Sequence, residues 1–139
     1  MPKVYGFDTG FVCFQRGWRE LRQEDLGLLW EHIVLDELIT TFGKDQIFYW
    51  RDKQKREVDF VLARRGQSPV AIECKWRAGR STKNTFAAMQ LLYPDLRCLV
   101  IAANGGSPRK INREGTLETG LEHIDRAVER LSGGEDWSS

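Results

Sequence analysis

The chain has 139 residues, of which 41% are hydrophobic and 29% are charged, with 21 Lys and Arg against 20 Asp and Glu. This length predicts a single domain over residues 1–134, followed by a disordered tail over 135–139. The composition excludes a wholly disordered chain, because enough apolar side chains are present to form a core.

Two further sequence features restrict where the protein works. No run approaches the ~18 apolar residues that a membrane span needs. The three cysteines are widely spaced and form no CxxC pair, which favours neither a disulfide framework nor a cysteine-based zinc site. We therefore expect a cytoplasmic protein without a membrane partner.

Positive charge is concentrated in one segment of the chain. Residues 51–83 hold ten basic and four acidic side chains, although the net charge of the whole chain is only +1. Such asymmetry is typical of a surface that binds a polyanion, but a solvated polar loop is the more common source of it.

Apolar spacing predicts the elements of the first half of the chain. Residues 1–20 are expected to form a short strand and turns. A helix is expected over 24–42, where apolar residues recur at helical spacing and Gly43 can end it. Strands are expected over 47–50, 57–62 and 70–75, the last two as a hairpin.

The second half is predicted to contain two helices and one strand. Ser81 can cap a helix that carries Phe86 and Met89 and stops before Pro94. Residues 98–102 form a continuous apolar run, which is typical of a strand covered on both faces, and 121–131 predict an amphipathic helix. A helix between two strands can return the chain in parallel, so we expect an α/β fold whose mixed sheet has helices on its faces.

Three charged residues interrupt the second and third strands of this set. Strand alternation places Asp59, Glu73 and Lys75 on one face, and the hairpin brings Asp59 near Glu73. A hard divalent cation would relieve the repulsion between the two carboxylates, and the lysine could then orient a water molecule or stabilise charge on a phosphate. The alternative is a partly exposed hairpin whose charges pair across the strands.

Five sequence segments together resemble a known family. The segments are PKVYGFDTG (2–10), LWEHIV (29–34), YWR (49–51), EVDFV (57–61) and IECK (72–75). They resemble the PD-(D/E)xK nuclease superfamily, and most closely the domain of unknown function 4143 family, found at the C-terminus of many bacterial and archaeal AAA-type ATPases. The resemblance covers about residues 2–102.

The resemblance implies a restriction-endonuclease-like, three-layer α/β core in the order helix, three strands, helix, strand. It also implies metal-dependent hydrolysis of DNA phosphodiester bonds, with Mg²⁺ or Mn²⁺ held by Asp59, Glu73 and the backbone carbonyl of Cys74. Glu31 would be an auxiliary metal ligand or an orienting carboxylate. Lys75 would be the catalytic lysine. Residues expected to contact the substrate are Arg51, Gln90, Trp76 and Arg77.

The chain departs from the family pattern in two ways. Val58 replaces the proline that usually precedes the aspartate, and no GxxxxGK motif is present, so an ATPase would act in trans or lie upstream in a longer chain. The alternative function is a catalytically silent module that binds nucleic acid or protein and serves an AAA-type ATPase. An RNA substrate and a homodimer are further possibilities. His32 and His123 are expected to be ordinary surface residues.

Overall fold

The computed structural model describes residues 23–51, 53, 57–77 and 85–133. The predictions for residues 1–20, for the Ser81 cap and for the tail over 135–139 lie outside these described residues. The helices are α2 (Gln23–Phe42), α3 (Thr85–Leu92) and α4 (Ile124–Ser132), with short 3-10 helices η1 (Lys44–Gln46) and η2 (Leu121–His123). The strands are β1 (Ile47–Arg51), β2 (Glu57–Leu62), β3 (Val70–Lys75), β4 (Arg97–Ala102), β5 (Arg109–Lys110) and β6 (Leu117–Thr119).

The strands form one six-stranded mixed sheet in the order β1-β2-β3-β4-β6-β5. Strands β3, β4 and β6 are parallel, whereas β1, β2 and β5 run antiparallel to their neighbours. The α3 helix lies between β3 and β4 in the chain and returns it in parallel, which confirms the mixed α/β sheet that the sequence predicts. Strands β5 and β6 were not predicted.

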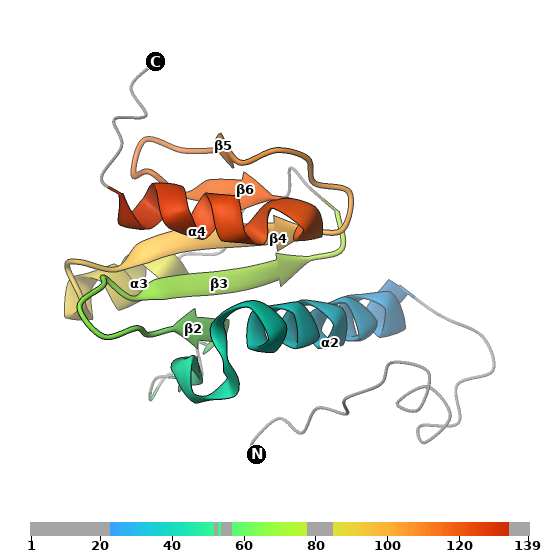
Figure 1. Ribbon diagram of the computed structural model, residues 1–139, viewed down its shortest axis with the longest axis horizontal. Coiled ribbons are helices and arrows are strands. Elements are labelled where there is room, and N and C mark those ends of the chain that lie inside the picture. Colours follow the sequence, from blue (N-terminus) through green and yellow to red (C-terminus); the bar gives the residue numbers. More distant parts are fainter. Residues whose placement is uncertain (1–22, 52, 54–56, 78–84, 134–139) are drawn as a thin grey trace.

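Helices cover both faces of the sheet (Figure 1). On one face, α2 and α4 pack against inward-facing strand residues that include Phe60, Leu62, Ile72 and Ile101. On the other face, α3 packs through Phe86 and Met89 against residues that include Val61, Ala71 and Val100. We call these the α2/α4 face and the α3 face.

The β2 strand carries an irregularity at one point. Phe48 pairs with Val61 and Trp50 pairs with Val58, so two steps along β1 are matched by three steps along β2. Asp59 and Phe60 together therefore lie opposite the single residue Tyr49. Val58 packs in the cluster on the α3 face rather than beside Phe60 as simple alternation predicts. A bulge of this kind bends the strand and re-aims side chains.

The parallel strands β3, β4 and β6 all end at the same edge of the sheet, which we call the carboxyl edge. Because β2 is antiparallel to β3 and β1 is antiparallel to β2, the start of β2 and the end of β1 also lie there. In open α/β sheets this edge is the usual place for ligands.

Candidate functional site

Asp59 is a buried carboxylate at the carboxyl edge. Only 8% of its surface is exposed, and the backbone N–H of Cys74 donates a hydrogen bond to its Oδ2 at 2.8 Å. The last paired residues of β2 and β3 are Phe60 and Ile72, so Asp59 accepts this bond just beyond the point where the regular ladder stops. The side chain therefore takes the place of a backbone acceptor between the two strands.

Glu73 and Lys75 flank Cys74 at the end of β3. Cys74 packs against the core of the α2/α4 face, whereas Ala71 belongs to the cluster on the α3 face. Because side chains alternate along a strand, Glu73 and Lys75 lie on the α3 face with Ala71. Both are half-buried, and Glu73 directly follows the last residue paired with β2.

The donor set at this point suits a hard cation. A carboxylate has two oxygens with several lone-pair sites, and Mg²⁺ and Mn²⁺ prefer oxygen ligands. Among residues 23–51, 53, 57–77 and 85–133, no group of three or more His, Cys, Asp or Glu side chains is arranged to hold a metal ion. The residues that could supply oxygen ligands to a metal are Asp59, Glu73, the Cys74 carbonyl and, from α2, Glu31.

Glu31 comes from a helix and not from the sheet. It lies on α2, which covers the α2/α4 face, next to the buried Trp30. The Trp30 Nε1–H donates a buried hydrogen bond to the carbonyl oxygen of Ile101 at 2.9 Å, and Ile101 pairs with Cys74. The structure thus anchors α2 beside the end of β3, with Glu31 on the helix that covers the opposite face.

Three of the four predicted substrate-binding residues, Arg51, Trp76 and Arg77, lie at the same edge. Arg51 is exposed at the end of β1 and pairs with Glu57 at the start of β2. Trp76 and Arg77 are exposed and directly follow β3. Gln90 is half-buried on α3, which packs on the face that carries Glu73 and Lys75.

The prediction for one histidine is wrong. His32 has only 1% of its surface exposed, so it is a buried residue of α2 and not a surface residue. His123 is half-buried in η2.

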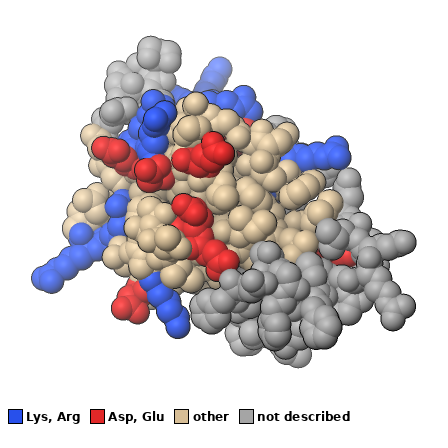
Figure 2. All heavy atoms as spheres, turned by 45° about the vertical axis from the view of Figure 1, so that its right-hand side comes forward, with Lys and Arg blue, Asp and Glu red and all other residues tan. Residues whose placement is uncertain are grey.

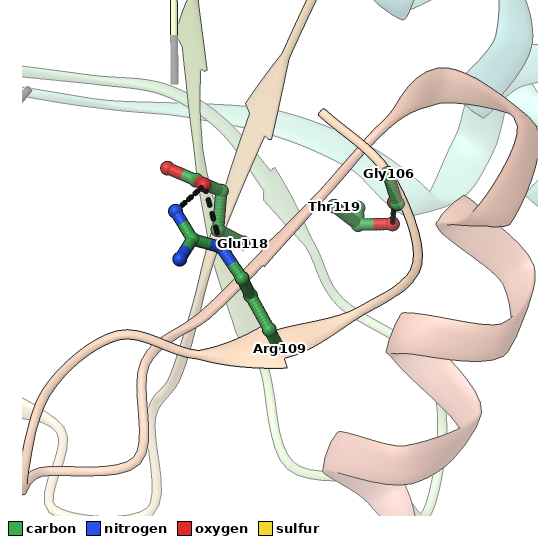
Figure 3. A network of polar contacts seen from close by, with 4 residues as sticks. All are labelled: Gly106, Arg109, Glu118 and Thr119. Carbon is green, nitrogen blue, oxygen red and sulfur yellow. Dashed lines mark hydrogen bonds and ion pairs between the residues drawn. The ribbon is translucent and has the colours of Figure 1, made fainter. Parts of the chain in front are cut away.

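The structure adds an ion pair that the sequence did not reveal. Arg109 on β5 donates to Glu118 Oε1 on β6 through Nη2 at 2.7 Å and through Nε at 3.1 Å (Figure 3). The Glu118 side chain is 3% exposed and that of Arg109 is 62% exposed. These strands have two and three residues, which is too short for an alternating pattern to be recognised in the sequence.

Figure 2 shows the end of the molecule toward which β3 points in Figure 1. Several acidic side chains lie near the middle of this view, and most Lys and Arg side chains project from its outline (Figure 2). Within the part of the chain that the structure describes, no helix is long and apolar enough to cross a membrane.

Three comparisons place the chain among known proteins. It is 30% identical over 98 residues to "Uncharacterized protein Mb2031c" of Mycobacterium bovis and to "Uncharacterized protein Rv2008c" of Mycobacterium tuberculosis. The match covers 65% of this chain and 22% of each relative, so the chain spans less than a quarter of the length of these curated relatives.

A solved structure and a family also match. The structure is the refined half-complex from the tetradecameric assembly of Thermococcus gammatolerans McrB AAA+ hexamers with bound McrC. The similarity has a TM-score of 0.48 at 12% identity and covers 76% of this chain and 33% of the matched one. The family described as "Domain of unknown function (DUF4143)" matches residues 26–116. Because this match includes more than half of the sequence, the chain belongs to the DUF4143 family.

Proposed function

We propose that this domain is a metal-dependent nuclease of the PD-(D/E)xK type, with a restriction-endonuclease-like arrangement of its core, that hydrolyses DNA phosphodiester bonds. The observation that carries the proposal is the hydrogen bond from the Cys74 N–H to the buried Asp59 carboxylate. It fixes one acid beside the strand end that carries Glu73 and Lys75.

The proposed roles follow from the chemistry of each group. Asp59 and Glu73 supply carboxylate oxygens, and Cys74 supplies a backbone carbonyl next to both. A bound Mg²⁺ or Mn²⁺ would polarise a phosphoryl oxygen and lower the pKa of a water ligand. Lys75 keeps a positive charge near the scissile phosphate, where it stabilises the negative charge that develops during attack.

The surrounding residues are suited to hold the substrate. Arg51 and Arg77 offer exposed guanidinium groups to backbone phosphates, and the exposed ring of Trp76 offers a stacking surface to a base. Gln90 and Glu31 are proposed as auxiliary polar groups, from α3 and α2 respectively. Phosphate contacts do not read sequence, so this surface favours no base order.

A cleavage assay tests the proposal. Supercoiled plasmid, single-stranded DNA and RNA are incubated separately with the protein and Mn²⁺. We expect cleavage of DNA by the wild type, and loss of cleavage in Asp59→Asn and Glu73→Gln, which keep side-chain size while removing charge. Glu57→Gln, an exposed position in the same strand β2, is the matched control and should keep activity.

Two results would contradict this assignment. If the wild type cleaves no substrate, the proposed nuclease activity is wrong. If both variants still cleave DNA, the assignment of Asp59 and Glu73 to the site is wrong. Cleavage of RNA alone would correct the substrate class and leave the site in place.

A second candidate is a binding module that lacks catalysis and serves an AAA-type ATPase. It is favoured by the absence, among the described residues, of a group of three side chains arranged for a metal. Calorimetric titration with Mn²⁺ separates the candidates. If the domain is a nuclease, the wild type should bind Mn²⁺ and Glu73→Gln should not. If it is a silent binding module, Glu73→Gln should not change Mn²⁺ binding.

A further inference from the structure

A row of residues crosses the sheet from the proposed site to its far edge. Glu73 on β3 pairs with Val100 on β4, Val100 pairs with Glu118 on β6, and Glu118 pairs with Arg109 on β5. Val100 belongs to the cluster on the α3 face. Paired residues of adjacent strands point to the same face, so Glu73, Glu118 and Arg109 share that face.

The geometry of the pair explains how Arg109 is oriented. Glu118 is a buried carboxylate, and burying such a charge is costly without a partner. Arg109 supplies this partner with two N–H groups, both directed at the single oxygen Oε1 (Figure 3). Arginine has five N–H donors in a rigid fork, so the remaining donors of this largely exposed guanidinium point outward in an orientation that Glu118 sets.

The distance along the row suits a nucleic acid strand. Three strand spacings of ~4.8 Å separate β3 from β5, which is about 14 Å. A B-form strand rises ~3.4 Å per nucleotide along the helix axis. A nucleic acid strand bound at the end of β3 therefore reaches Arg109 within a few nucleotides.

Arg109 also changes the charge of the α3 face. Glu118 adds a negative charge to the face that carries Glu73, and an uncompensated acid here would repel a polyanion. Arg109 neutralises Glu118 and keeps further donors for an anion. The exposed Lys110 next to it pairs with Leu117, which packs in the cluster on the α2/α4 face, so Lys110 points away from this face.

We propose that Arg109, held by Glu118, is a second phosphate-binding position on the α3 face that holds the nucleic acid backbone at a distance from the cleavage site. This inference rests on the proposed function, because it assumes that nucleic acid is the ligand. It assigns a role to β5 and β6, which lie outside the three-strand motif that carries Asp59, Glu73 and Lys75.

Equilibrium binding at several salt concentrations tests the proposal. Fluorescence anisotropy with a labelled 20-base-pair DNA is measured in Ca²⁺ for the wild type and for Arg109→Gln, Lys110→Gln and the double variant Arg109→Gln/Glu118→Gln. Lys110→Gln is the matched control, since it removes the same charge from the neighbouring residue on the other face. The double variant keeps the net charge of the wild type and removes the buried acid together with Arg109.

We expect Arg109→Gln to weaken binding about fivefold to tenfold and to reduce the slope of log K against log salt by about one, as the loss of one phosphate contact predicts. The double variant should show the same reduction in slope and should unfold at the same temperature as the wild type. Lys110→Gln should change affinity less than twofold. If Arg109→Gln and Lys110→Gln behave alike while the wild type binds DNA, this inference is wrong and the proposed function stands. If the wild type binds no nucleic acid, both are wrong.

Discussion

Asp59 Oδ2 accepts a hydrogen bond of 2.8 Å from the backbone N–H of Cys74, across the point where β2 and β3 cease to pair. The bond joins the two strands that carry the proposed acids. It also places Asp59 beside Glu73, because Cys74 directly follows Glu73 in the chain. A single interaction thus serves both the sheet and the proposed site.

Removing the Asp59 acceptor is expected to destabilise the fold. Asp59→Ala leaves the Cys74 N–H without its observed acceptor, so the free energy of unfolding in metal-free buffer should fall by about 1 to 3 kcal/mol. Asp59→Asn keeps an oxygen acceptor and should lose less. Urea unfolding measures both. Glu57→Ala, exposed in the same strand, should stay within about 0.5 kcal/mol of the wild type, and an equally small loss in Asp59→Ala would show that the bond contributes little.

Lys75 is expected to act on the reaction rather than on the fold or the metal. Lys75→Ala should lower kcat by about a hundredfold or more, because a positioned positive group at developing charge contributes on this scale. Manganese affinity should be retained, since an ammonium group cannot be a ligand. Single-turnover cleavage and calorimetry measure the two quantities. Lys44→Ala, an exposed lysine in η1, is the control, and a Lys75→Ala enzyme with wild-type kcat would exclude the assigned role.

Two loops at the carboxyl edge approach so closely that only glycine fits. A Cβ atom added at Gly120 would collide with the backbone carbonyl oxygen of Gly105, and a Cβ atom at Gly105 would lie 2.7 Å from the carbonyl oxygen of Thr119. Figure 3 shows the neighbouring contact, in which the Thr119 hydroxyl donates to the carbonyl oxygen of Gly106. One loop follows the end of β4 and the other follows the end of β6.

Gly120→Ala should therefore lower the free energy of unfolding by about 2 kcal/mol or more, because the obstructing atoms belong to the backbone and cannot rotate away. Gly106→Ala is the matched control, since nothing lies within 4 Å of its added Cβ atom. Urea unfolding of both variants checks the prediction. Equal stability of the two variants would show that the loops can separate without cost.

Cys98 gives a prediction at alkaline pH. Burial raises the pKa of its thiol from 9.0 to about 12, because the thiolate is poorly solvated in the α3-face cluster. The folded state thus holds its proton at pH values where the unfolded state releases it. The resulting contribution to stability is complete below about pH 9 and is lost as pH rises from 9 toward 12. Cys98→Ala should show a shallower decrease in the free energy of unfolding over this range, and parallel curves would contradict the assignment.

Local patterns predicted most of the sheet and little of its far edge. The β2 and β3 strands have the predicted bounds, 57–62 and 70–75, because alternating and β-branched residues extend over six positions in each. The α3 helix starts at Thr85 and ends at Leu92, in keeping with a stop before Pro94, whereas Tyr93 lies beyond it and is 47% exposed. The β5 and β6 strands were missed, since their two or three residues become strands only because β6 pairs with β4 and β5 pairs with β6.

The amino-acid sequence by itself determined which residues are available for chemistry and on which elements they lie: Asp59 on the second strand, Glu73 and Lys75 around Cys74 on the third, and Glu31 on the first long helix. These assignments follow from periodicity, which is a property of neighbours in the chain. Tertiary structure alone decided that Asp59 sits at an irregular point of β2, that α2, which carries Glu31, covers the opposite face, that His32 is buried, and that Arg109 aligns with Glu73 across the sheet. Each of these depends on how distant segments pair, and pairing is settled by packing and hydrogen bonding between strands.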